Sequence, residues 1–148
     1  MTNPTAFANI PIQVVTPENT GGLAIAKSLL HEIHAMLQTL IDRGQSGVID
    51  LRALPPIGIE GYQFLRDKLS AGEVSARIHG FGRSEIQESI YPGIWWITHF
   101  NQDDEIATEL IEVCFVPEIL KSQGDDVVMG WGKLGELLQE VSTKAEVA

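Results

Sequence analysis

Apolar residues recur at intervals of three and four along the first half of the chain, the spacing of an amphipathic helix. They predict one long helix that begins near Thr20 to Gly22 and stops at Gly44. Its expected core positions are Leu23, Ala26, Leu30, Ile33, Leu37 and Leu40. A second helix is predicted over Ile59–Leu69, with one apolar side formed by Tyr62, Leu65 and Leu69.

A third helix is predicted near the end of the chain. It should begin at Asp125 or Asp126, which suit an N-cap, and should reach about Val141. Its apolar positions at helical spacing are Val128, Trp131, Leu134, Leu138 and Val141. Three glycines, Gly130, Gly132 and Gly135, each disfavour a helix by about 1 kcal/mol relative to alanine. We therefore expect close packing against another element to compensate for them.

Five shorter stretches have the composition and the flanking turns of strands. They are Gly47–Leu51, Glu73–His79, Ser84–Ile90, Gly93–Phe100 and Ile106–Val116. The connections between the last four are too short for a parallel crossover, which needs about a dozen residues, so these strands should be antiparallel neighbours. The expected fold is α+β: an antiparallel sheet of four to five strands with helices packed on one face, the first and last helices among them.

Residues 1–20 differ in composition from the rest. They are rich in Pro, Thr and Asn around a short apolar run that includes Ile10, Ile12, Val14 and Val15. We expect residues 1–20 to form an extended N-terminal arm with one edge strand, and residues 21–148 to form a single domain.

The charge of the chain narrows the classes of partner. Twenty acidic residues against ten basic ones give a formal net charge of −10, which repels nucleic acid and anionic lipid.

Other features indicate the compartment. The single cysteine, Cys114, excludes an internal disulfide and suits a reducing compartment. The N-terminus lacks the features of an export signal, and no apolar stretch approaches the ~20 residues that span a bilayer. We expect a cytoplasmic protein without a nucleic-acid partner or a membrane span.

Histidines offer the most obvious metal ligands. His31 and His34 lie three residues apart, but together with Lys27 and Gln38 they form a polar stripe opposite the apolar one. Such a stripe is typical of a solvated helix face, so no metal is expected there. The alternative is a maturation factor that carries a metal or an iron–sulfur intermediate through His31, His34, His79, His99 or Cys114.

Two further features resemble catalytic motifs. The run HGFGRS, His79 to Ser84, contains two glycines but joins two predicted strands, so it indicates a hairpin with positive-φ glycines in place of a phosphate loop. Four strand carboxylates, Glu85, Glu88, Glu109 and Glu112, are the residues that a small hydrolase would use. Like charges on neighbouring strands repel, so most of these carboxylates should reach solvent.

Two adjacent tryptophans, Trp95 and Trp96, must point to opposite faces of the sheet because successive strand residues alternate. One is expected in the helix-covered core. The other is expected on the second face, against the N-terminal arm, a second subunit or a client protein. Large aromatic residues are enriched in binding hot spots, so this second face is a candidate interface.

Several motifs occur together in one order between Leu54 and Pro117. They are the Leu54-Pro55 loop, LSAGEVSARIHGFGRSEIQES over residues 69–89, GIWWITHFN over 93–101 and IEVCFVP over 111–117. This combination resembles the C-terminal conserved region of the HupH/HyaF/HoxQ family of nickel–iron hydrogenase expression proteins.

The resemblance implies a chaperone in hydrogenase maturation that has no cofactor and no catalytic activity. The implied partner is a structural subunit of the hydrogenase, chiefly the small subunit held in the cytoplasm before its export, with other maturation proteins as further partners. The binding candidates that it suggests are Glu73, Arg77, Gly80, Gly82, Ser84, Glu88, Trp95, Trp96 and Glu112. The metal or cluster carrier and, less favoured, the small hydrolase remain the alternatives.

Overall fold

A computed structural model describes residues 17–147, with side chains from residue 21 onward. Residues 1–16, most of the expected arm and all of its expected edge strand, lie outside the described residues. The elements are α1 (Pro17–Arg43), β1 (Gly47–Asp50), α2 (Gly58–Leu69), β2 (Ser75–His79), β3 (Arg83–Glu88), β4 (Ile94–Phe100), β5 (Ile106–Val113), the short 3₁₀ helix η1 (Glu118–Leu120) and α3 (Gly124–Glu146). The three predicted helices and the five strands predicted between residues 47 and 116 are all present, although α1 begins at Pro17, before the expected start.

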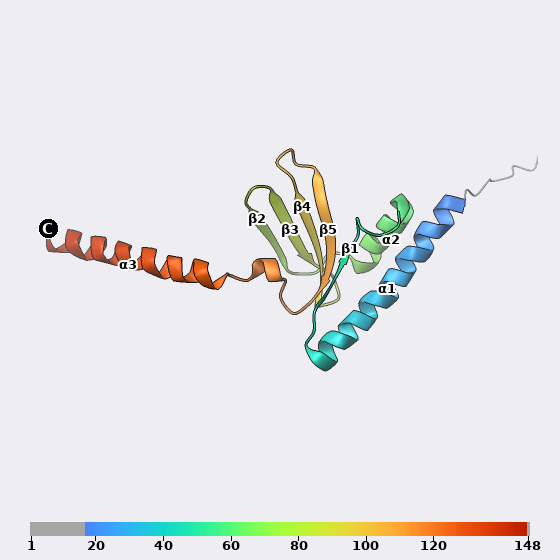
Figure 1. The fold of residues 1–148 in the computed structure, drawn as a ribbon, viewed down its shortest axis with the longest axis horizontal. Helices are drawn as coiled ribbons and strands as arrows, with labels where there is room; N and C mark the ends of the chain where they lie inside the picture. Colours follow the sequence, from blue (N-terminus) through green and yellow to red (C-terminus); the bar gives the residue numbers. More distant parts are fainter. Residues whose placement is uncertain (1–16, 148) are drawn as a thin grey trace, which may run out of the picture.

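The five strands form one antiparallel sheet in the order β1-β5-β4-β3-β2. Strands β2 to β5 follow one another as a meander, whereas β1 pairs with β5 at the far end of the sequence (Figure 1). The predicted α+β fold with an antiparallel sheet is therefore confirmed.

Helices α1 and α2 lie side by side and cover one face of the sheet (Figure 1). Ala26, Leu29, Ile33 and Leu40 of α1 are buried against Leu65 and Leu69 of α2 and against the inward residues of the sheet. Leu23, Leu30 and Leu37, which were also expected in the core, are only partly buried. Leu29 takes a core position because α1 faces both the sheet and α2, so its apolar stripe is wider than the sequence suggested.

The two helices cross at a pair of glycines. A Cβ atom on Gly61 would lie 2.7 Å from the carbonyl oxygen of Gly22, and a Cβ atom on Gly22 would overlap the carbonyl group of Ile57. Only a residue without a side chain fits at either position. This close approach fixes where α2 sits along α1.

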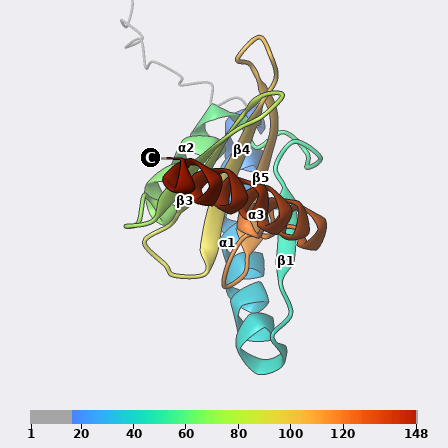
Figure 2. The same ribbon diagram turned by 90° about the vertical axis from the view of Figure 1, so that its left-hand side faces the viewer.

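The expectation that the last helix covers the sheet is wrong. Helix α3 extends away from the sheet, on the side opposite α1 and α2, and buries none of its residues (Figures 1 and 2). Its glycines have open space around them, so the expected compensating contact is also absent from the described chain. The N-cap is Gln123, with Asp125 and Asp126 in the first turn. An amphipathic pattern shows that a helix has an apolar stripe but does not identify what covers it.

The run HGFGRS forms the predicted hairpin between β2 and β3, but its glycines do not have positive φ. The positive-φ glycines are Gly44, Gly58 and Gly93. Gly82 serves a different purpose, because a Cβ atom there would overlap the carbonyl oxygen of Phe100. The hairpin therefore needs this glycine for close backbone contact with the end of β4.

Candidate protein-binding site

The two tryptophans point to opposite faces of the sheet, as predicted. Trp96 belongs to the core under α1 and α2, and Trp95 belongs to a smaller apolar cluster on the second face with Ile86, Ile97 and Cys114. Each tryptophan is only 5% exposed, and the indole Nε1 of Trp95 donates a hydrogen bond to the carbonyl oxygen of Cys114 at 3.1 Å. The chain therefore covers Trp95 itself, with Leu120 of η1 packed against the cluster.

Two acidic residues flank Trp95 on the second face. Glu88 of β3 and Glu112 of β5 are its direct neighbours across the strands. Both are partly exposed, and each carboxylate accepts a backbone N–H at 3.3 Å, from Gly93 and from Glu118 respectively. On this part of the second face, two partly exposed carboxylates therefore flank a buried indole.

The other candidates from the sequence lie elsewhere. Arg77 is on the helix-bearing side of the sheet, in an ion pair of 3.2 Å with Glu85. Glu73 precedes β2, and Gly80 and Gly82 form the hairpin turn at the end of that strand. The nine candidate residues are thus divided between two faces and a turn, and the fold does not bring them into one patch.

Ser84, another of these candidates, pairs with a histidine on the second face. Its Oγ lies 2.8 Å from Nδ1 of His99. Catalytic Ser–His pairs need a carboxylate that orients the imidazole. The residues beside this pair in the same row are Ile78 and Thr108, neither of which is an acid. The arrangement therefore lacks the third member of a hydrolytic triad.

Most of the strand carboxylates were expected to reach solvent, and Glu109 is the exception, because it is 7% exposed beneath α2. Its Oε2 accepts hydrogen bonds from the hydroxyl of Tyr62 at 2.8 Å and from Nε1 of Trp96 at 2.9 Å. The guanidinium of Arg66 stacks over the Trp96 ring at 4.1 Å. Burial, and then the bond to Glu109, raise the pKa of Tyr62 above 10.0. Through these contacts, Tyr62 and Arg66 of α2 are joined to Trp96 and Glu109 of the sheet in one structural cluster.

The possible metal ligands are dispersed. Among residues 17–147, no three side chains of His, Cys, Asp or Glu come together in a way that could hold a metal ion. His31 and His34 lie with Lys27 and Gln38 on the exposed side of α1, as predicted. Burial, and then the charge of Glu112, raise the pKa of the Cys114 thiol to about 12, so the thiol stays protonated at neutral pH.

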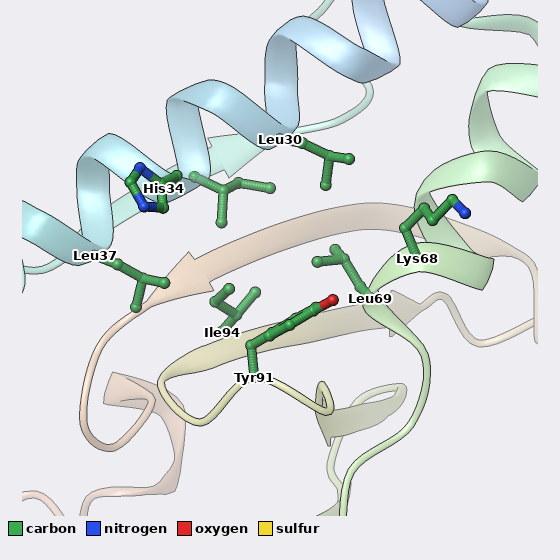
Figure 3. A pocket seen from close by; sticks show the side chains of 8 residues that line it. Leu30, His34, Leu37, Lys68, Leu69, Tyr91 and Ile94 are labelled. Carbon is green, nitrogen blue, oxygen red and sulfur yellow. The ribbon is translucent and has the colours of Figure 1, made fainter.

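An apolar pocket of about 270 Å³ opens between α1, the C-terminal end of α2 and the turn that follows β3 (Figure 3). Its lining residues are Leu30, Ile33, His34, Leu37, Lys68, Leu69, Tyr91 and Ile94. Five of these eight residues are leucine or isoleucine, and the Tyr91 ring lies along one side. A cavity of this size accepts an apolar side chain from a partner.

Two basic side chains stand among the pocket residues. His34 of α1 and Lys68 of α2 are both exposed there, and Tyr91 is 49% exposed. In a chain with a net charge of −10, this grouping is a local exception. The pocket could not be predicted from local sequence patterns, because its three walls are separated in the chain. The one local signal is the Tyr91-Pro92-Gly93 turn, where Gly93 has φ of 90°.

No helix among residues 17–147 combines the length and the apolar character that a membrane crossing requires.

The sequence matches a known protein family. The family described as HupH hydrogenase expression protein, C-terminal conserved region, matches residues 23–141 of the chain. The match includes α2, the whole sheet and most of α1 and α3.

The chain resembles curated proteins of several bacteria. It is 35% identical over 105 residues to the hydrogenase expression/formation protein HoxQ of Cupriavidus necator, an alignment that covers 71% of this chain and 36% of that protein. It is 26% identical over 129 residues to the hydrogenase expression/formation protein HupH of Rhodobacter capsulatus, which covers 87% of this chain and 46% of that protein. The matched part is thus less than half of either relative.

A solved structure shares the fold. The hydrogenase expression protein HupH from Thiobacillus denitrificans superposes with a TM-score of 0.76 at 38% sequence identity. The superposition covers 79% of this chain and 97% of that one. The α+β arrangement and the motifs between residues 69 and 117 therefore agree with one and the same family.

Proposed function

Because this chain belongs to the HupH hydrogenase expression protein family, in which it matches the C-terminal conserved region, we propose that it is a non-catalytic assembly factor for nickel–iron hydrogenase. It binds a structural subunit of the hydrogenase before the enzyme is assembled, the small subunit before its export being the favoured client. The family match carries this proposal, and the names of the relatives support hydrogenase maturation as the process.

The pocket between α1, α2 and Tyr91 is the proposed point of contact with the client. It is mainly apolar and about 270 Å³ in volume, whereas Trp95 and Trp96 are each only 5% exposed and offer little accessible surface. An apolar side chain of the client enters it, and an acidic group beside that side chain meets Lys68 or His34. Removal of such apolar surface from water supplies affinity, and the basic groups select the client segment.

Binding fits the described residues better than catalysis does. The Ser84–His99 pair lies in a row without an acid, and the Cys114 thiol is buried and protonated. The buried carboxylate of Glu109 accepts hydrogen bonds from Tyr62 and Trp96. None of these groups lines the apolar pocket, where a substrate would be held.

The test is a pull-down with the tagged chain from cells that express the hydrogenase genes, with the captured subunits identified by mass spectrometry. Tyr91→Ala removes one wall of the pocket and Lys68→Glu reverses its charge. We expect each variant to reduce capture of the small subunit, since truncating a hot-spot aromatic costs at least about 2 kcal/mol of binding, or roughly 30-fold in Kd.

Phe81→Ala is the matched control. Phe81 is an aromatic residue that is 95% exposed, and it lies in the hairpin at the other end of β3 from Tyr91. It should capture the client as well as the parent chain does. If Phe81→Ala loses the client and Tyr91→Ala retains it, the hairpin is the contact and the pocket is not. If the parent captures neither structural subunit, the proposed function is wrong.

A further inference from the structure

The apolar residues of α3 have the spacing of a coiled coil. Intervals of four and three residues alternate along one side, which is the pattern of the a and d positions in a heptad repeat. The six residues of this α3 seam are Val127, Trp131, Leu134, Leu138, Val141 and Ala145. The first five are each between 57 and 79% exposed. An apolar stripe of this kind is unfavourable in water, so the seam indicates a missing partner.

The other features of α3 fit the same interpretation. Its far side is mainly polar, with Lys133, Glu136, Gln139, Glu140 and Thr143. With 23 residues the helix is about 34 Å long, enough for three heptads. The helix extends away from the sheet, and so the whole seam is accessible to another chain (Figure 1).

We propose that α3 pairs with α3 of a second copy of this chain as an antiparallel two-stranded coiled coil. The charges at the two ends favour this occupant and this direction. Asp125 and Asp126 lie in the first turn and Lys144 in the last. An antiparallel pair places the lysine of each copy near the aspartates of the other and aligns the helix dipoles favourably. A parallel pair brings the four aspartates together at one end.

The heptad pattern also specifies the register. When the seams face each other in opposite directions, Leu134 packs against Leu138 of the second copy, and Trp131 against Val141. Val127 then meets Ala145. Each of these layers occurs twice by symmetry, which gives six layers in all, and a large residue faces a smaller one in the layers that contain Trp131.

The proposed pairing explains why two of the glycines in α3 are tolerated. Gly130 and Gly135 flank the seam, and each has open space around it in the single chain. In the antiparallel register Gly135 meets its own counterpart near the two-fold axis, so the backbones can approach closely there. Gly130 faces Lys144 of the second copy and leaves room for the lysine side chain. Gly132 points away from the seam.

The oligomeric state of the 148-residue chain tests the proposal by sedimentation equilibrium from micromolar to near-millimolar concentration. The parent chain should be a dimer at the upper end of this range. Leu134→Glu combined with Leu138→Glu should abolish the dimer. The control, Gln139→Glu combined with Thr143→Glu, adds the same charge to the far side of α3 and should remain dimeric.

Cysteine cross-linking tests the direction of pairing, and the buried Cys114 can remain in place. Gly135→Cys should form disulfide-linked dimers, and a mixture of Gly130→Cys and Lys144→Cys chains should form linked heterodimers. Lys144→Cys alone should not cross-link. A parent chain that stays monomeric throughout, a seam variant that stays dimeric, or a Lys144→Cys chain that links to itself would overturn the proposal. A monomer whose seam binds a different protein would overturn it as well.

Discussion

The cluster that Glu109 forms with Tyr62, Trp96 and Arg66, called the Glu109 cluster below, should contribute a large share of the stability of the fold. The substitution Glu109→Ala measures this contribution. The substitution removes the acceptor of two hydrogen bonds, from the Trp96 indole and from the Tyr62 hydroxyl. Trp96 is 5% exposed, so its N–H is left buried without a partner at a cost of about 1–3 kcal/mol. Tyr62 is only partly buried, so the loss of the hydrogen bond from its hydroxyl should lower the unfolding free energy by roughly 1 kcal/mol.

The expected loss is therefore about 3 kcal/mol, which is a substantial part of the roughly 5–15 kcal/mol available to a domain of this kind. Glu109→Gln keeps an oxygen acceptor at nearly the same place and should cost only about 1 kcal/mol. Urea unfolding followed by tryptophan fluorescence and circular dichroism gives both values. Trp95 and Trp96 are each 5% exposed, so the environment of both indoles changes on unfolding.

A double-mutant cycle with Tyr62→Phe separates the hydrogen bond from the packing. In the parent chain Tyr62→Phe should cost about 1 kcal/mol, because the charged acceptor loses one donor. In the Glu109→Ala background the same change should be neutral or slightly stabilising, because it removes a hydroxyl that no longer has its acceptor. Equal costs in the two backgrounds, or a Glu109→Ala chain within about 0.5 kcal/mol of the parent, would refute this account of the cluster.

Two other predictions concern Cys114 and the helix glycines. Burial raises the pKa of the Cys114 thiol from 9.0 to about 12, so the unfolded chain releases this proton first, and stability that is present in full below about pH 9 is lost as the pH rises toward 12. The unfolding free energy, measured with urea between about pH 8 and pH 10, should therefore fall with rising pH more steeply in the parent chain than in Cys114→Ala. The difference between the two slopes should reach up to about 1.4 kcal/mol per pH unit, and identical slopes would contradict this prediction. Gly61→Ala should destabilise the chain by at least about 2 kcal/mol, because the new methyl group meets the backbone of α1, whereas Gly132→Ala in the open part of α3 should raise helicity by circular dichroism without loss of stability. Equal melting temperatures for Gly61→Ala and the parent would show that the helices separate at little cost.

The sequence was sufficient for the secondary structure because each signal is local. The alternation in β4 placed Trp95 and Trp96 on opposite faces, and the short turns between β2 and β5 required antiparallel pairing. Glu109 was also within reach of the same reasoning. It alternates with Ile111 and Val113, both of which are buried, so period-two spacing already placed its side chain toward the core.

What the sequence did not reveal depends on contacts between distant segments. The pocket needs Leu30 of α1, Lys68 of α2 and Tyr91 of a turn to meet, and no local pattern encodes that meeting. The position of α3 was mispredicted for a related reason, since its apolar stripe was assigned to the sheet of its own chain. One of the two adjacent tryptophans was expected to face a partner on the second face, but Trp95, which lies there, is 5% exposed and is covered by its own chain, with Leu120 packed against its cluster.

The pairing of β1 with β5 has a consequence during synthesis on the ribosome. Gly47 pairs with Val113, so β1 emerges long before the strand that receives it. The strands β2 to β5 need only short loop closures and can form a meander among themselves as they emerge, whereas β1 must close a loop of more than sixty residues. Helices α1 and α2 can meet earlier through Gly22 and Gly61, and this contact shields part of the apolar side of α1 while the nascent chain waits for β5.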